Sequence, residues 1–107
     1  MNTITNNHHK CSIALHALQQ VTDPEIGLNI VDLGLVYQVD FDDAEQKIYA
    51  LMTLTTQFCP MGESIVDAVR NALQAVFPGN EVDVALTFNP RWHNGLISEK
   101  GKTFLKS

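Results

Sequence analysis

The chain has 107 residues, of which 45% are hydrophobic and 18% are charged, and this composition is typical of one small globular domain rather than of a disordered chain. Twelve acidic residues against seven basic ones give a net charge of −5, which argues against a nucleic-acid partner, because binding to phosphates needs a basic face. Without a long apolar run or a signal-peptide core, we expect a cytoplasmic protein with no membrane partner.

The first predicted element is a helix. Residues 1–11 are polar and are predicted to form a disordered tail, followed by a single domain over residues 12–107. From Ser12, the predicted N-cap, apolar residues recur at steps of three and four, and Pro24 stops the helix. Residues 24–34 mix apolar residues with glycine, asparagine and aspartate, so they are predicted to be a structured loop.

An antiparallel hairpin is predicted next. Residues 35–41 and 47–55 alternate between apolar and polar side chains and are joined by a polar turn over residues 42–46. The apolar residues expected on the inner face of the hairpin are Leu35, Tyr37, Val39, Phe41, Ile48, Ala50, Met52 and Leu54. A third strand is predicted over residues 81–89, where the alternation is most regular.

A helix over residues 63–77 separates the hairpin from the third strand, and a last helical segment over residues 98–105 begins at Ser98 as its cap. The element order is therefore α-β-β-α-β with a short C-terminal helical appendage. This order predicts a two-layer α/β sandwich with a mixed three-stranded sheet and helices on one face. The crossover through the long helix makes the third strand parallel to the second.

Three irregular segments, residues 32–34, 56–62 and 89–93, are predicted to meet at one end of this sheet, where function often lies. Cys59 precedes Pro60 near the start of the long helix, and a helix N-terminus favours the thiolate, which is both a nucleophile and a soft metal ligand. The alternative is a small, buried and inert cysteine. We expect Cys59 rather than Cys11 to be the reactive thiol.

Other residues of these segments allow two interpretations each. Asp23 and Glu25 could form a carboxylate pair, although Asp-Pro-Glu more often forms a helix-end turn in which the aspartate binds backbone amides. Asp32 could orient a loop, and Trp92 could be a core residue or a loop lid. His93 is interpreted as a surface or satisfied polar residue.

The motifs resemble those of the SufT/PaaD-like iron–sulfur cluster assembly family, whose domain has a NifU C-terminal-like fold. The motifs that carry the resemblance over about residues 13–105 are Asp23-Pro24-Glu25, residues 29–36 with Asp32-Leu33-Gly34, Leu54-Thr55-Thr56 followed by Cys59-Pro60-Met61, and Asn89-Pro90-Arg91-Trp92. The resemblance implies a non-enzymatic carrier or targeting factor for iron–sulfur proteins, in which Cys59 is the cluster or metal ligand. It also implies that Asp23, Glu25, Asp32, Thr55, Thr56 and Trp92 support the site. The sequence departs from the family pattern at Gln57-Phe58 and at Arg91.

One cysteine cannot hold a cluster alone, because clusters take four thiolate or equivalent ligands. We therefore expect at most a transient iron–sulfur cluster or iron ion, shared with an assembly scaffold, a client apoprotein or a second copy in a homodimer. Two other functions stay open. A thiol-based redox enzyme could use Cys59, although no resolving cysteine or loop arginine accompanies it. A plain interaction module would leave Cys59 inert.

Overall fold

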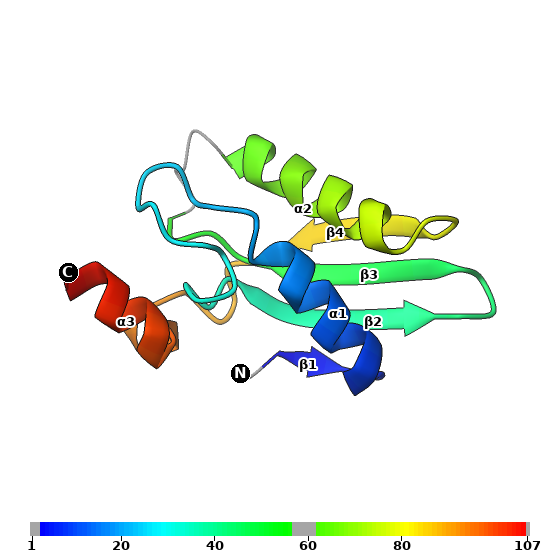
Figure 1. The fold of residues 1–107 in the computed structure, drawn as a ribbon, viewed down its shortest axis with the longest axis horizontal. Helices are drawn as coiled ribbons and strands as arrows, with labels where there is room; N and C mark the ends of the chain where they lie inside the picture. Colours follow the sequence, from blue (N-terminus) through cyan, green and yellow to red (C-terminus); the bar gives the residue numbers. More distant parts are fainter. Residues whose placement is uncertain (1–2, 57–61, 107) are drawn as a thin grey trace.

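The computed structural model describes residues 3–56 and 62–106, which form one four-stranded sheet with two helices packed on the same face (Figure 1). The strands are β1 (Ile4–Thr5), β2 (Val36–Asp42), β3 (Lys47–Met52) and β4 (Glu81–Leu86), and the helices are α1 (His8–Leu18), α2 (Gly62–Val76), α3 (Glu99–Lys106) and the 3-10 turn η1 (Asn94–Leu96). The predicted α/β class is confirmed, and the sheet has one strand more than predicted. Among the described residues, no helix is long and apolar enough to cross a membrane.

The strands lie in the order β1-β2-β3-β4, so neighbours in sequence are neighbours in the sheet. The β2–β3 hairpin is antiparallel, as predicted, and β4 pairs with β3 in parallel, which confirms the crossover through α2. The unpredicted strand β1 pairs in parallel with β2. Because the crossover returns the chain to the same end of the sheet, β3 and β4 finish side by side.

The core lies between the sheet and helices α1 and α2. On β3 and just after it, the predicted inner residues Ile48, Ala50, Met52 and Leu54 are all buried. On α2, the buried stripe consists of Ile65, Val69 and Leu73. At about 25 cal/mol per Å² of apolar surface, these buried side chains supply the main driving force for folding.

Three details of the strand predictions are wrong. Strand β3 ends at Met52 rather than at residue 55. A register shift between Val36 and Gln38 breaks the alternation of β2, so Val36 is buried and Tyr37 turns its hydroxyl to the Pro90 carbonyl. Strand β4 ends at Leu86 rather than at residue 89, and Leu86 is 43% exposed. This strand is a sheet edge, where one neighbour is missing and cover is thinner.

The N-terminal residues are also more ordered than predicted. Strand β1 and the first turn of α1 occupy the stretch that was predicted to be disordered, and the N-cap is Asn7, whose side chain accepts the N–H of Lys10 at 3.0 Å. Ser12 lies inside the helix and bonds back to the His8 carbonyl, as mid-helix serines do. The Asn6 side chain extends the sheet by bonding both the N–H and the C=O of Phe41.

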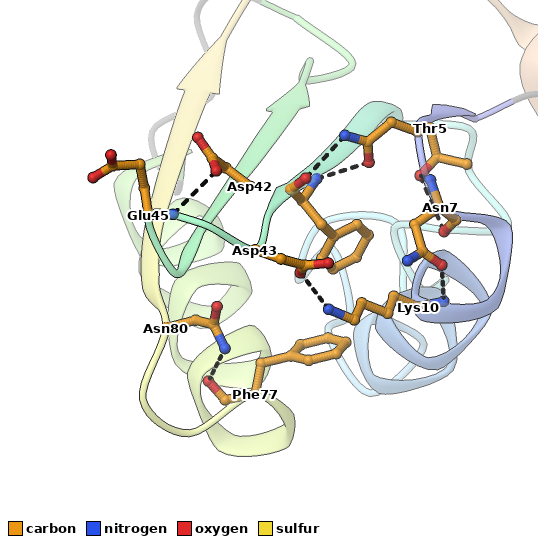
Figure 2. Close-up of polar contacts among 10 residues, drawn as sticks. Thr5, Asn7, Lys10, Asp42, Asp43, Glu45, Phe77 and Asn80 are labelled. Carbon is orange, nitrogen blue, oxygen red and sulfur yellow. Dashed lines mark hydrogen bonds and ion pairs between the residues drawn. The ribbon is translucent and has the colours of Figure 1, made fainter.

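The hairpin end of the sheet is held by polar contacts (Figure 2). Lys10 of α1 forms an ion pair with Asp43 in the β2–β3 turn, and its ammonium lies 5.7 Å from the ring centroid of Phe41. Asp42 accepts the N–H of Glu45 and so closes the turn. This end is therefore tied down by the first helix, and the irregular loops collect at the opposite end.

Candidate functional site

Three described segments that are distant in sequence, residues 32–35, 52–56 and 87–93, meet at the end of the sheet opposite the β2–β3 turn (Figure 1). The Thr53 N–H donates to the Leu35 carbonyl at 2.8 Å, and the Thr87 N–H donates to the Met52 carbonyl at 2.9 Å. These bonds carry the pairing of β2, β3 and β4 beyond the regular strands. The segments around Asp32 and Trp92 are thus brought together, as their positions in the topology predicted.

Asp32 is the centre of a buried hydrogen-bond network at this end. Its carboxylate is 7% exposed and accepts the Ser98 hydroxyl on Oδ1 at 2.8 Å and the Asn29 amide on Oδ2 at 2.7 Å. Its backbone N–H donates to Asn29 Oδ1, and its carbonyl accepts the Ser98 N–H at 2.8 Å. We call Asn29, Asp32 and Ser98 the latch, because it joins the loop before β2 to the start of α3.

The latch also caps the last helix. The Ser98 Oγ atom that donates to Asp32 accepts the N–H of Gly101, which confirms Ser98 as the predicted cap. A Cβ at Gly101 would lie 3.0 Å from a Leu28 methyl and 3.1 Å from the Asp32 carbonyl oxygen. The absence of a side chain on Gly101 is therefore what lets α3 pack directly on the loop.

Trp92 makes a second connection between the same segments. Its indole N–H donates to the Leu33 carbonyl at 2.6 Å, and the ring is half-buried against the core. Gly34 has φ 79°, and a Cβ there would lie 2.3 Å from the Leu96 carbonyl oxygen. The Asp-Leu-Gly motif therefore binds the C-terminal segment at three consecutive residues.

Asp23 has the role of a turn organiser. Its side chain is 1% exposed, and Oδ1 accepts the backbone N–H groups of Glu25 at 2.9 Å and Ile26 at 3.3 Å. Its carbonyl accepts the N–H of Gly27, which has φ 83°. Glu25 is exposed, so the two carboxyl groups differ in environment, and the geometry fits a helix-end turn better than a catalytic pair.

Thr55 and Thr56 follow β3, the first half-buried and the second exposed, at the end of the sheet that holds the latch. Cys59, Pro60 and the rest of residues 57–61 lie outside the described residues, and the description resumes at Gly62, the first residue of α2. A Cβ at Gly62 would lie 2.9 Å from a Leu54 methyl, so the start of α2 packs against the end of β3.

The described side chains of this site hold loops in position. Within residues 3–56 and 62–106, no group of three or more His, Cys, Asp or Glu side chains could hold a metal ion. Both Asp23 and Asp32 already accept hydrogen bonds from the protein. Cys11 is 5% exposed on the buried side of α1, and burial raises the pKa of its thiol, so it stays protonated and poorly nucleophilic.

Two residues of the latch were missed by the sequence analysis as site residues. Ser98 was predicted only as a helix cap, and Asn29 only as part of a loop and of the family motif over residues 29–36. The spacing Asn29-x-x-Asp32 is the sequence signal that could have found the first bond, because a short polar side chain often accepts an N–H three residues later. The contact between Asp32 and Ser98 spans 66 residues and has no local signal.

Comparisons with known proteins agree with this architecture. The family model described as "Iron-sulfur cluster assembly protein" matches residues 14–86. The chain is 42% identical over 89 residues to an Fe-S protein maturation auxiliary factor, YitW, of Bacillus subtilis, covering 83% of this chain and 86% of that one. It is 40% identical over 85 residues to an Fe-S protein maturation auxiliary factor, SufT, of Staphylococcus aureus, covering 79% and 96%.

A solved structure shows the same fold. The crystal structure of a domain of unknown function, DUF59, from Bacillus anthracis superimposes with a TM-score of 0.83 at 36% identity and covers 89% of this chain and 90% of that one. The matched residues 14–86 include the Asp23 turn, the Asp-Leu-Gly motif and Cys59. The resemblance inferred from the motifs is thus confirmed, and this chain belongs to the iron–sulfur cluster assembly protein family.

Proposed function

We propose that this protein matures iron–sulfur proteins by holding a cluster or iron ion transiently, with Cys59 as its thiolate ligand and with the other ligands supplied by a second chain. The family membership supports the role in maturation. The observation that favours a shared ligand set is the lack of any group of three or more ligating side chains among the described residues. A cluster needs four ligands, so one thiolate requires a partner.

The latch has a positioning role in this proposal. Asp32, Asn29 and Ser98 hold the loop before β2 against the C-terminal segment, and Trp92 reinforces the contact through Leu33. Asp23 shapes the turn that precedes this loop. These residues therefore build a fixed platform at the end of the sheet where β3 leads into Thr55 and Thr56, three residues before Cys59.

The partners that this chemistry calls for are an assembly scaffold that supplies the cluster and client apoproteins that receive it. Handover by ligand exchange needs no acid, base or redox residue of this chain, so the protein acts as a non-enzymatic factor. A cytoplasmic location suits the proposal, because a thiolate ligand must stay reduced. The thiol redox alternative predicts turnover of peroxide by wild type and its loss in Cys59→Ser, and we expect no such turnover.

Anaerobic reconstitution with iron and sulfide tests the proposal. We expect visible absorbance from bound cluster, at well under one cluster per chain, in wild type and in the control Cys11→Ala. Cys59→Ser should lose this absorbance while its far-ultraviolet circular dichroism stays native. A cluster that survives Cys59→Ser, or that is stoichiometric on a monomer, would contradict the proposal and indicate other ligands.

A further inference from the structure

The sheet face opposite α1 and α2 exposes several apolar side chains. We call this the open face, and its residues alternate with the core residues along each strand: Ile4, Gln38, Asp40, Asp42, Lys47, Tyr49, Leu51, Glu81, Asp83 and Ala85. Ile4 is 63% exposed and Tyr49 is 43% exposed. Tyr49 lies on the inner strand β3, and Ile4 lies on the edge strand β1, in the row that also holds Leu51 and Ala85. Apolar surface thus crosses the open face, and an exposed apolar patch of this kind indicates a contact surface.

Charge on the open face is concentrated toward the hairpin end. The strand register places Asp40 and Asp83 on either side of Tyr49, and the next row outward is Asp42, Lys47 and Glu81. These two rows, which we call the acidic rows, contain four carboxylates and one lysine. The hairpin end of the open face is therefore negative.

The opposite end of the open face is hollowed, and the helix at its rim has a net positive charge. A groove of about 610 Å³ lies there, lined by Ile4, Gln38 and Leu51 of the sheet and by Pro90, Glu99 and Lys102 of the C-terminal segment. Helix α3, which forms its rim, carries three lysines and one glutamate, and its Phe104 is 52% exposed. Figure 1 shows α3 and the β2–β3 hairpin at opposite ends of the molecule, whose longest extent is 43 Å.

We infer that the open face binds a second copy of this chain, with the strands of the two sheets antiparallel. A twofold axis between the faces and perpendicular to the strands places α3 of each copy against the acidic rows of the other. The lysines of α3 then face the acidic rows at both ends of the dimer, and Tyr49 and Leu51 are covered in the middle. The contact is isologous, as in most dimers, because both copies use the same surface. A parallel arrangement would oppose like charges at both ends.

The size of the face shows why α3 must take part. A standard interface buries about 800 Å² per partner, roughly an eighth of the 6360 Å² accessible surface of this chain. Strands β2, β3 and β4 have six or seven residues and β1 has two, so with a spacing of about 4.8 Å and a rise of about 3.4 Å per residue the flat face is at most about 20 by 20 Å. The sheet alone is too small for a stable dimer, so α3 and the walls of the groove supply the rest.

The antiparallel dimer also determines which chain could complete a cluster site, an inference that rests on the proposed function. In the antiparallel dimer, the two latches lie at opposite ends of the assembly. A cluster beside one latch would then be completed by a scaffold or client chain and not by the second copy. The dimer itself does not depend on Cys59, so its test does not involve the cluster.

A charge-swap experiment in sedimentation velocity tests the dimer. The first variant, Lys102→Glu/Lys106→Glu, reverses two charges four residues apart on one side of α3, where Lys102 lines the groove. The second variant, Asp40→Lys/Asp83→Lys, reverses the pair beside Tyr49. Each variant alone should be monomeric, with the dissociation constant raised at least about 100-fold, because like charges then meet twice. An equimolar mixture should form a heterodimer, because both contacts become complementary again, and 0.5 M salt should weaken it.

The control is Glu63→Lys/Asp67→Lys on α2, which changes the net charge as much as the second variant and should leave the dimer intact. Tyr49→Glu should also give a monomer, and native circular dichroism is required of every variant compared. The inference is overturned if the wild type is a monomer at about 100 μM, if the α3 variant still dimerises, or if the mixture of the two charge variants stays monomeric.

Discussion

Removing the bond between Asp32 and Ser98 is the most direct perturbation of the site. The three variants are Ser98→Ala, Asp32→Ala and the double variant. The Ser98 hydroxyl donates at 2.8 Å to the carboxylate of Asp32, a residue that is 7% exposed. The same carboxylate accepts the Asn29 amide at 2.7 Å. Because Asp32 and Ser98 are 66 residues apart, the bond couples the loop before β2 to α3.

The magnitudes follow from this geometry. Hydrogen bonds to charged groups contribute about 1.5–3 kcal/mol, and a buried donor left unpaired costs about 1–3 kcal/mol. Asp32→Ala leaves the Ser98 hydroxyl and the Asn29 amide without their acceptor. It should lower the free energy of unfolding by about 3 kcal/mol, or Tm by about 15 °C in a chain this size. Ser98→Ala loses the same bond and the cap on Gly101 and should cost about 2 kcal/mol. Because both variants break one bond, the double variant should cost about 1.5 kcal/mol less than the sum.

Urea unfolding measured by circular dichroism gives these free energies, and Trp92 fluorescence adds a local signal. Trp92 is the only tryptophan of the chain, and its indole bonds the residue next to Asp32. We expect its emission to shift to longer wavelength in both single variants before global unfolding. The control is Asp67→Ala, which removes an exposed ion pair with Arg70 and should cost no more than about 0.5 kcal/mol. Additive costs in the double variant, or an unchanged Trp92 signal, would refute the latch.

Two further predictions concern Gly34 and Cys11. Gly34→Ala and Gly79→Ala both place a side chain at positive φ, but only Gly34→Ala creates a clash, because its Cβ would lie 2.3 Å from the Leu96 carbonyl oxygen. In urea unfolding, Gly34→Ala should therefore lower the free energy of unfolding by at least about 2 kcal/mol more than Gly79→Ala does. Equal costs would mean that the contact with Leu96 is unimportant. Because burial raises the pKa of the Cys11 thiol, the folded chain keeps the thiol proton at pH values where the unfolded chain has lost it. The contribution of the neutral thiol to the free energy of unfolding is therefore full below about pH 8.5 and is lost as the pH rises further. Wild type should therefore lose more stability than Cys11→Ala between pH 8 and 10, and parallel losses would show that Cys11 does not contribute.

Much of this protein was determined by local sequence pattern. The period-two alternation of residues 47–54 placed Ile48, Ala50 and Met52 in the core, and the helical stripe of Ile65, Val69 and Leu73 placed α2 on the sheet. The crossover rule then made β4 parallel to β3 and brought Asp32 and Trp92 to one end of the sheet. Pattern and handedness are enough here, because burial of apolar faces constrains which side chains point inward.

Other features were decided only by tertiary contacts. Strand β1 has two residues and exists because β2 offers an unpaired edge. The bulge that turns Tyr37 outward breaks the alternation of burial along β2, but the order of apolar and polar residues in the sequence does not signal it. The bond of Asp32 to Ser98 depends on how the C-terminal segment returns over the loop before β2. The physical reason is the range of the interactions. Propensity and periodicity act over a few residues, whereas a buried polar side chain is satisfied by whichever donor the complete fold brings to it.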